Sequence, residues 1–195
     1  MRTACLLAFA IGAAWAQQET TPVFGTTVVI SSGLRGTVYH MHRGSLVLPD
    51  FQKLKPAGVI YTTSLDIPPQ DFRAGFPGVT KRNEWFAIDY TGRFWIENAG
   101  AYSFSLLSDD GSILYIDDAS VIDNDGLHPP AEKRGDVYLD HGVHSVRISY
   151  FQGPRFQVAL QLKIAPQGGA FRIFNTDELK PPSDSEHWRT PPEQH

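Results

Sequence analysis

The chain has 195 residues, of which 42% are hydrophobic and 19% charged, and its formal net charge is −4. This length suits one domain, and the composition supports a packed core and excludes a disordered chain. The acidic balance argues against nucleic acids and anionic membranes as partners, because both attract basic surfaces.

The N-terminus has the pattern of a secretory signal peptide. An apolar stretch from Leu6 to Ala14 ends in the small-residue cleavage motif Ala14-Trp15-Ala16. We therefore expect residues 1–16 to be removed and the mature protein to be secreted, periplasmic or held at the cell surface. The single cysteine, Cys5, leaves with this segment, so the fold is expected to need no disulfide. The rest of the sequence predicts no insertion into a membrane.

The first half of the mature chain predicts short strands joined by long turns. Residues 17–32 are expected to form a polar leader and a first strand, Thr26 to Ile30, and a second strand follows from Leu34 to Met41. The stretch from Pro49 to Gly78 is rich in proline, glycine and turn residues, which predicts a surface connection with one strand at Val59 to Thr63.

A hairpin is predicted in the middle of the chain. Trp85 to Tyr90 and Arg93 to Ile96 are both strand-like, and Thr91-Gly92 between them is expected to form the turn.

Three later segments alternate apolar and polar residues with the period of a strand, namely Tyr102 to Leu106, His144 to Tyr150 and Phe156 to Ile164. One buried face and one wet face per strand predict an all-β fold, an antiparallel β-sandwich or barrel-like single domain. We expect this domain to span residues 33–166. Residues 167–195 are expected to form a C-terminal extension and flexible tail, with a weak signal for a short helix after Asn175.

The strongest candidate for a site is the acidic turn Ser108-Asp109-Asp110-Gly111. Neighbouring residues of a regular strand face opposite ways, so Asp109 and Asp110 reach one ion only if the backbone bends sharply. A cis peptide between them is one route, and Gly111 permits the return. Calcium prefers such hard oxygen ligands but takes six to eight of them. A third loop must therefore contribute, and we expect Gln152 to supply an amide oxygen; a plain Asp-Gly hairpin is the alternative.

A second acidic turn, Asp123-Asn124-Asp125-Gly126, follows one strand pair later. It matches part of the EF-hand loop pattern, but Val121 occupies the first ligand position and Pro129-Pro130 interrupts the loop. The flanking residues also predict strands where an EF-hand needs helices. This turn is therefore predicted to lie near the first one, with Asn124 and Asp125 either contacting ligand or only shaping the turn.

Catalysis has little support in the sequence. Glycoside hydrolysis needs two carboxyl groups on opposite sides of a substrate, which adjacent residues such as Asp109 and Asp110 do not suggest. No G-x-S-x-G motif occurs, and the mature chain has no cysteine nucleophile. The pairs His40 with His42 and His141 with His144 lack an obvious third zinc ligand, so we expect surface histidines there.

Several segments together resemble the protective-antigen type domain (PA-fourteen), a family named for the anthrax toxin protective antigen. The resemblance covers roughly Gly33 to Pro166. It rests on Gly33-Leu34-Arg35-Gly36, Glu84-Trp85-Phe86-Ala87-Ile88, Gly92-Arg93-Phe94, Ser108-Asp109-Asp110-Gly111-Ser112, Leu114-Tyr115-Ile116-Asp117, Val121 to His128 and Tyr150-Phe151-Gln152-Gly153.

This resemblance implies a β-sandwich and, in the lectin-like members, an Asp-Asp pair joined by a cis peptide that holds calcium against sugar hydroxyls. Asp109 and Asp110 match that pair, and Gln152 is the candidate for the amide from a later loop. Arg155 is a candidate donor to a sugar oxygen, and Trp85, Trp95 and Phe151 are candidate ring faces.

The function expected from the sequence is an exported, non-catalytic module that binds a glycan or polysaccharide through calcium. A structural or interaction module of the cell surface without sugar binding, and an accessory subunit of a glycosidase, remain the alternatives.

Overall fold

A computed structural model describes residues 33–72, 75–79 and 84–182. The predicted signal peptide, the strand at residues 26–30 and the end of the tail lie outside these ranges. Eleven strands and one short 3-10 helix are present in the described part: β1 Leu34–His40, η1 Phe51–Lys53, β2 Pro56–Thr62, β3 Asp66–Asp71, β4 Phe86–Ile96, β5 Gly100–Asp109, β6 Ser112–Ile116, β7 Ala119–Asn124, β8 Ala131–Leu139, β9 Gly142–Gln152, β10 Gln157–Pro166 and β11 Arg172–Ile173.

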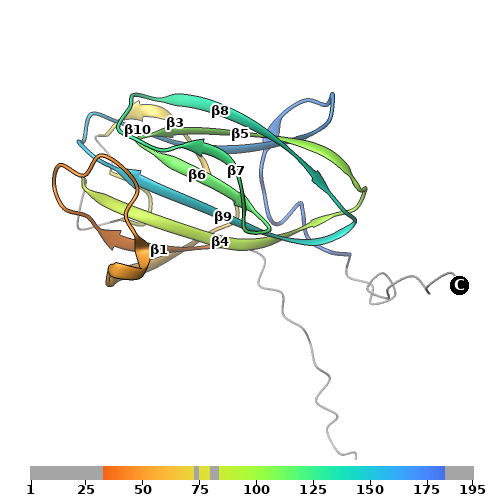
Figure 1. The fold of residues 1–195 in the computed structure, drawn as a ribbon, viewed down its shortest axis with the longest axis horizontal. Coiled ribbons are helices and arrows are strands. Elements are labelled where there is room, and N and C mark those ends of the chain that lie inside the picture. The colour runs from red at the N-terminus through yellow and green to blue at the C-terminus, as the bar shows by residue number, and fades with distance from the viewer. Residues whose placement is uncertain (1–32, 73–74, 80–83, 183–195) are drawn as a thin grey trace, which may run out of the picture. The chain divides into compact units, whose positions relative to one another are not determined.

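The strands form two antiparallel sheets packed as a sandwich, which confirms the predicted fold class (Figure 1). One sheet has the order β2-β1-β4-β9-β6-β7, and the other has the order β11-β10-β5-β8. β3 also pairs with β10, beside the half of that strand that β11 leaves free. Within the described ranges, no helix is long and apolar enough to cross a membrane.

The alternating patterns place one face of each long strand in the space between the sheets. Leu106 of β5, Ile148 of β9 and Leu162 of β10 are fully buried there, and Phe94 packs edge-on against Phe104 with ring centroids 6.4 Å apart. Burial of these side chains is the main force holding the sheets together, since each contributes about 2 kcal/mol. The core therefore provides a rigid support for the loops at the strand ends.

The hairpin predicted at Thr91-Gly92 is wrong, because β4 runs through both residues without interruption. Thr91 pairs with Arg35 on one side and with Arg147 on the other, so the ladder continues across the proposed turn. A Cβ on Gly92 would lie only 2.8 Å from Leu34 Cδ2. The glycine therefore permits a close approach of β1, and no turn is needed to explain it.

The connection between Pro49 and Gly78 holds more structure than the sequence indicated. Instead of one strand it contains η1, β2 and β3. The described segment 75–79 also contributes to the core, since Phe76 stacks on Tyr150 with centroids 5.3 Å apart. Apolar residues within a proline-rich stretch therefore close one side of the sandwich.

Residues from 167 to 182, predicted as part of a C-terminal extension, pack into the sandwich. Phe174 is fully buried in the core, and the Thr176 amide donates to the Thr63 carbonyl oxygen. The prediction of a short helix after Asn175 is wrong. The Asn175 carbonyl oxygen accepts from the Glu178 and Leu179 amides, and this makes a single turn.

Candidate functional site

The antiparallel ladders bring several loops to one end of the sandwich. There β5 ends, β6 begins, β7 ends, β9 ends and β10 begins, and neighbouring strands are in register up to these ends. The end pairs are Ala159 with Asp109, Ser108 with Ala131, Ser112 with Asn124 and with Tyr150, and Phe86 with Gln152. The two acidic turns and the Gln152 turn, far apart in sequence, therefore adjoin one another.

The acidic pair occupies the centre of this end. The peptide bond between Asp109 and Asp110 is cis, as the sequence and the resemblance suggested. Each residue is only 6% exposed. The Asp110 carboxylate accepts from the backbone amide of Gly153 at 2.7 Å and from that of His128 at 3.3 Å. Two other loops thus hold Asp110 in place through backbone donors.

Gly111 explains how the pair can be packed so closely. A Cβ at this position would lie 2.4 Å from Phe151 Cε1, 2.7 Å from Asp125 Oδ1 and 2.7 Å from the Gly126 nitrogen. Any side chain here would push apart the two acidic turns and β9. The glycine is therefore required by close packing between three elements.

Gln152 lies directly behind the pair and is fully buried. Its Oε1 accepts from the Tyr150 hydroxyl at 2.7 Å, and that hydroxyl also contacts the Asp109 carbonyl oxygen at 2.7 Å. Its Nε2 faces three acceptors: Asp110 Oδ2 at 3.3 Å and the carbonyl oxygens of Pro154 and Gln157, both at 3.1 Å. In this arrangement Gln152 presents donors to the site, and its amide oxygen points to the tyrosine.

Burial makes it unfavourable for both carboxyl groups to be ionised at the same time. Desolvation, followed by repulsion from Asp110, raises the pKa of Asp109 to about 6. The pKa of Asp110 is also raised by burial, although the amides of Gly153 and His128 oppose the shift. Burial likewise holds the pKa of Tyr150 well above its usual range, so its hydroxyl remains a hydrogen-bond donor. A cation between the carboxylates would relieve this repulsion.

The second acidic turn has a different environment. Asn124 is 1% exposed, and its Nδ2 donates to Ser108 Oγ and to the Ala131 carbonyl oxygen, both at 3.0 Å. Asp125 Oδ1 accepts from the Leu48 amide at 2.9 Å and from the Gly126 amide at 2.8 Å. The structure therefore does not bring these two side chains into the site as direct ligand contacts, and both brace the loops around it.

A pocket of about 310 Å³ opens over the acidic pair. Besides the two aspartates, it is lined by Leu127, His128, Pro129, Pro154, Phe156 and Gln157. Arg155 is exposed between two of these lining residues but does not itself line the pocket. The pocket thus combines two carboxylates with walls that are mostly apolar, which suits a small ligand with both polar and apolar surfaces.

The ring faces expected from the sequence are not accessible. Trp85 is 6% exposed, Trp95 is 7% exposed and Phe151 is fully buried. Phe156 is instead 80% exposed. The sequence pattern assigned it to the apolar face of the next strand, but β10 begins at Gln157, and Phe156 belongs to the preceding turn. Leu127, His128 and Phe156 are the site residues that sequence patterns alone missed.

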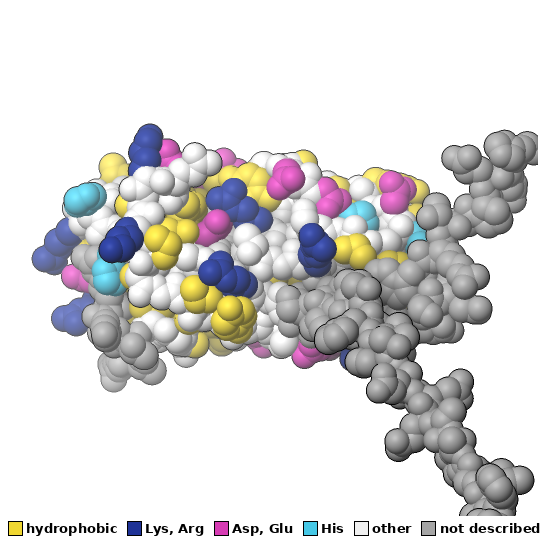
Figure 2. Space-filling view, turned by 90° about the horizontal axis from the view of Figure 1, so that it is seen from below, with side chains coloured by type: hydrophobic (Ala, Val, Ile, Leu, Met, Phe, Trp, Pro, Cys, Tyr) yellow, Lys and Arg dark blue, Asp and Glu magenta, His cyan; other side chains and the backbone are white. Residues whose placement is uncertain are grey.

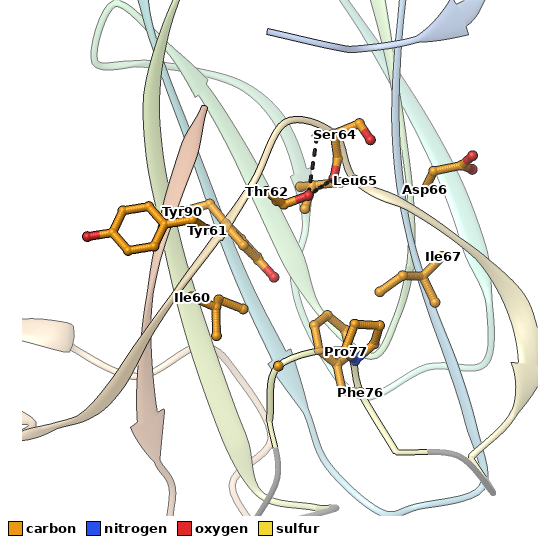
Figure 3. A pocket seen from close by; sticks show the side chains of 11 residues that line it. Ile60, Tyr61, Thr62, Ser64, Leu65, Asp66, Ile67, Phe76, Pro77 and Tyr90 are labelled. Atoms are coloured by element: carbon orange, nitrogen blue, oxygen red, sulfur yellow. Dashed lines mark hydrogen bonds between the residues drawn. The ribbon is translucent and has the colours of Figure 1, made fainter. Parts of the chain in front are cut away.

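Two other pockets lack such a carboxylate pair. One, of about 360 Å³, lies beside β2 and β3 and is lined by Ile60, Thr62, Ile67 and Phe76 among others (Figure 3). Its one carboxylate, Asp66, accepts from Gln161 Nε2 at 2.6 Å. The other, of about 580 Å³, is lined by two glutamates among others, but Glu97 accepts from Trp95 Nε1 at 2.8 Å and Glu178 pairs with Arg172, so they do not form an adjacent buried pair. Volume alone therefore does not identify the site, and we place it at the smaller pocket because of its chemistry.

Charge is unevenly distributed on the face seen in Figure 2, where Lys and Arg side chains gather toward the end that carries the site. Arg43 and Lys53, in the connection after β1, have side chains that are 81% and 82% exposed. Each lies close to a carboxylate, Arg43 to Glu84 at 3.7 Å and Lys53 to Asp50 at 2.9 Å, so these two charges are balanced locally.

The histidine pairs do not form zinc sites. No group of three or more His, Cys, Asp or Glu residues with metal-binding geometry occurs in the described part of the chain. His144, expected at the surface, is 8% exposed and contacts Asp117 Oδ2 at 2.6 Å through Nδ1. It links the turn between β6 and β7 to the start of β9. A cation at the acidic pair would therefore need carbonyl, water or ligand oxygens besides the two carboxylates.

Comparison with known proteins places this geometry in a family. The family model of the PA14 domain matches residues 66–171. The solved PA14 sugar-binding domain from an RTX adhesin has a TM-score of 0.62 at 22% identity, covering 75% of this chain and 96% of that one. The A domain of epithelial adhesin 9 from Candida glabrata, in complex with Galβ1-3GlcNAc, has a TM-score of 0.53 at 15% identity, covering 75% and 87%.

An anti-sigma factor domain-containing protein has a TM-score of 0.61 at 22% identity, and the match covers 78% of this chain and 49% of that protein. The chain thus spans about half the length of that protein. No curated protein sequence matches the chain. At these identities the structural likeness concerns the fold, and the match to the family model identifies the domain.

Proposed function

Because the chain belongs to the PA14 domain family, we propose that it is a non-catalytic module that binds carbohydrate through a calcium ion held by Asp109 and Asp110. The observation that carries the proposal is the acidic pair itself. The two carboxylates are buried side by side, burial raises the pKa of both, and repulsion from Asp110 adds to the shift of Asp109. The name of one structural neighbour, a sugar-binding domain, agrees with this role.

The donor set of the pocket fits a calcium ion. Asp109 and Asp110 supply hard, charged oxygens, and calcium accepts the irregular geometry of loop ligands. When bound, the ion would neutralise the pair and offer further coordination positions to the adjacent hydroxyls of a sugar. The described chain supplies few side-chain ligands, which leaves room for ligand oxygens at the mouth of the pocket.

The surrounding residues orient the pair. The amides of Gly153 and His128 fix the Asp110 carboxylate. Gln152, for which we predicted a direct ligand role, instead approaches the carboxylate with Nε2. A donor cannot coordinate a cation, so we propose that Gln152 positions Asp110 and braces the turn from Gly153 to Gln157.

Secretion or display at the cell surface is part of this proposal. The predicted signal peptide supports it, because such a segment directs a protein out of the cytoplasm.

The test compares melting temperatures of residues 17–195 in calcium and in chelator, followed by a glycan array in both conditions. We expect calcium to raise the melting temperature and to be required for glycan binding. Asp110→Ala should lose both effects. Asp136→Ala is the matched control, because that exposed residue contacts Ser103 on the second sheet and not the pocket. Identical melting of wild type in calcium and chelator would refute the calcium site.

A further inference from the structure

We propose that the pocket beside β2 and β3 is a second ligand site. It takes a small uncharged molecule with an apolar body and one oxygen that accepts a hydrogen bond from the Tyr90 hydroxyl. The pocket encloses about 360 Å³, within the range of small-molecule sites. Ile60 of β2 and Ile67 of β3 face one another across it (Figure 3), and it shares no lining residue with the pocket of the acidic pair.

Strand register explains how a residue of an inner strand reaches this pocket at the edge of the sheet. Ile60 of β2, Gly36 of β1 and Tyr90 of β4 are direct cross-strand partners, so all three lie on the face that points between the sheets. A Cβ on Gly36 would lie only 2.6 Å from Tyr90 Cε1 and 2.8 Å from Tyr90 Cδ1. The Tyr90 ring therefore lies over Gly36, across β1, and lines the pocket beside Ile60.

The Tyr90 hydroxyl is the group that would recognise the ligand. Tyr90 is 2% exposed, and among the described residues none forms a hydrogen bond with its hydroxyl. The hydroxyl of Tyr150, also buried in the core, instead contacts Gln152 and Asp109. Burial raises the pKa of Tyr90 well above its usual range, so its hydroxyl keeps the proton. A buried donor without a partner is unfavourable, and an acceptor on a bound molecule would relieve that cost.

One wall of the pocket is held in place by the aromatic core. The Phe76 ring stacks on Tyr150 and meets Phe86 edge-on, with centroids 5.3 Å and 5.6 Å apart. The Val79 amide donates to the Phe76 carbonyl oxygen at 3.0 Å and closes the turn through Pro77. These contacts fix the wall without any ligand, so the pocket is already formed.

The rest of the lining favours an uncharged ligand. Leu65, Ile67 and Pro77 are apolar, and a charged group placed among them would lose its hydration without compensation. The Asp66 carboxylate, which also lines the pocket and accepts from Gln161 Nε2 at 2.6 Å, would repel an anion. A neutral molecule with one carbonyl or hydroxyl oxygen matches both the walls and the Tyr90 donor.

The test titrates residues 17–195 in chelator with acetophenone, toluene and benzoate at millimolar concentrations, and follows the backbone amide resonances by NMR. Acetophenone offers a carbonyl acceptor, toluene has a similar ring without one, and benzoate carries a negative charge. We expect acetophenone and toluene to shift the amides of Ile60, Leu65 and Tyr90 and to leave those of Asp109 and Asp110 unchanged. Benzoate should shift none of them.

Tyr90→Phe isolates the contribution of the hydroxyl and keeps the ring that packs on Gly36. This variant should weaken acetophenone binding about tenfold, the value of one hydrogen bond, and leave toluene binding unchanged. Tyr138→Phe is the matched control, because Tyr138 is 66% exposed on β8 and does not line the pocket.

Three results would each overturn the inference. Absence of shifts at the pocket with both neutral compounds would show that it is not a ligand site. Equal acetophenone affinity of wild type and Tyr90→Phe would refute recognition by the hydroxyl. Benzoate binding as tight as that of acetophenone would refute selection of an uncharged ligand. Because the titrations are done in chelator, these results do not depend on calcium or sugar binding at the acidic pair.

Discussion

The two acidic turns of this chain look alike in sequence and differ in what their carboxylates do. In Asp109-Asp110-Gly111 the pair lines a pocket, and its pKa values are raised. In Asp123-Asn124-Asp125-Gly126 the side chains are engaged with other loops: Asp125 holds the connection after β1, and Asn124 joins β7 to β5 and β8. A cluster of acidic residues is a candidate ion site when its carboxylate oxygens face a pocket, and not when they are already accepting hydrogen bonds from neighbouring loops.

The largest effect is expected where the two turns touch. Gly111→Ala should reduce the free energy of unfolding by about 3 kcal/mol or prevent folding, because its Cβ would overlap Phe151, Asp125 and Gly126. Gly58→Ala is the matched control, since a Cβ there meets nothing within 4 Å. Urea unfolding measures both. Equal midpoints for the two variants would show that the turns are not packed as described.

Substitution of one aspartate in each turn tests the comparison directly. Asp110→Asn should abolish calcium-dependent stabilisation, which reaches about 2.7 kcal/mol at a hundredfold excess over Kd. Asp125→Asn should lower stability in calcium and in chelator alike, by about 1 kcal/mol, because it weakens the acceptor for Leu48 and Gly126. Thermal melts of both variants in calcium and in chelator measure these effects. A variant at Asp125 that also lost the calcium response would make the second turn part of the ion site.

Gln152→Glu distinguishes a positioning residue from a ligand. The new carboxylate oxygen would face Asp110 Oδ2 and the carbonyl oxygens of Pro154 and Gln157 in place of a donor. We therefore expect calcium affinity to fall about tenfold, since like charges repel and three acceptors lose their partner. A direct ligand role predicts the opposite, because an added negative charge would strengthen binding. Isothermal titration calorimetry shows whether the substitution lowers or raises the calcium affinity.

A pH dependence is expected from the first turn. The pKa of Asp109 in the folded protein is raised from 3.8 to about 6. In chelator, the folded state therefore binds more protons than the unfolded state between these values, and stability from this group falls as pH rises from about 4 to 6. Protons compete with calcium over the same range, so calcium affinity should fall as pH drops below 6. Asp109→Asn should flatten the stability profile in chelator, whereas a profile unchanged by that substitution would assign the titration to another group.

Local sequence patterns were sufficient to predict strands and turns whose conformation depends on neighbouring residues along the chain. The alternation in Tyr102 to Leu106 and in His144 to Tyr150 identified β5 and β9, because one face of each strand must be buried. Ser108-Asp109-Asp110-Gly111 also identified the acidic turn. The same local reasoning failed at Thr91-Gly92, where a glycine that makes room for Leu34 has the composition of a turn.

The orientation of individual side chains at the site required the tertiary structure. Gln152 has a donor end and an acceptor end, and only the positions of Tyr150, Pro154 and Gln157 determine which end meets Asp110. Phe156 continues the apolar alternation of β10 in sequence, yet it lies one residue before the strand and faces the pocket. Neither outcome follows from residue type or spacing.

The sequence by itself determined the all-β class, the family and the acidic pair, because strand periodicity and motif order are local properties. The tertiary structure alone decided which loops meet around that pair, which side chains are buried and which aromatic ring is presented. Those features depend on strand register and on contacts between residues more than forty positions apart, such as Asp110 with Gly153.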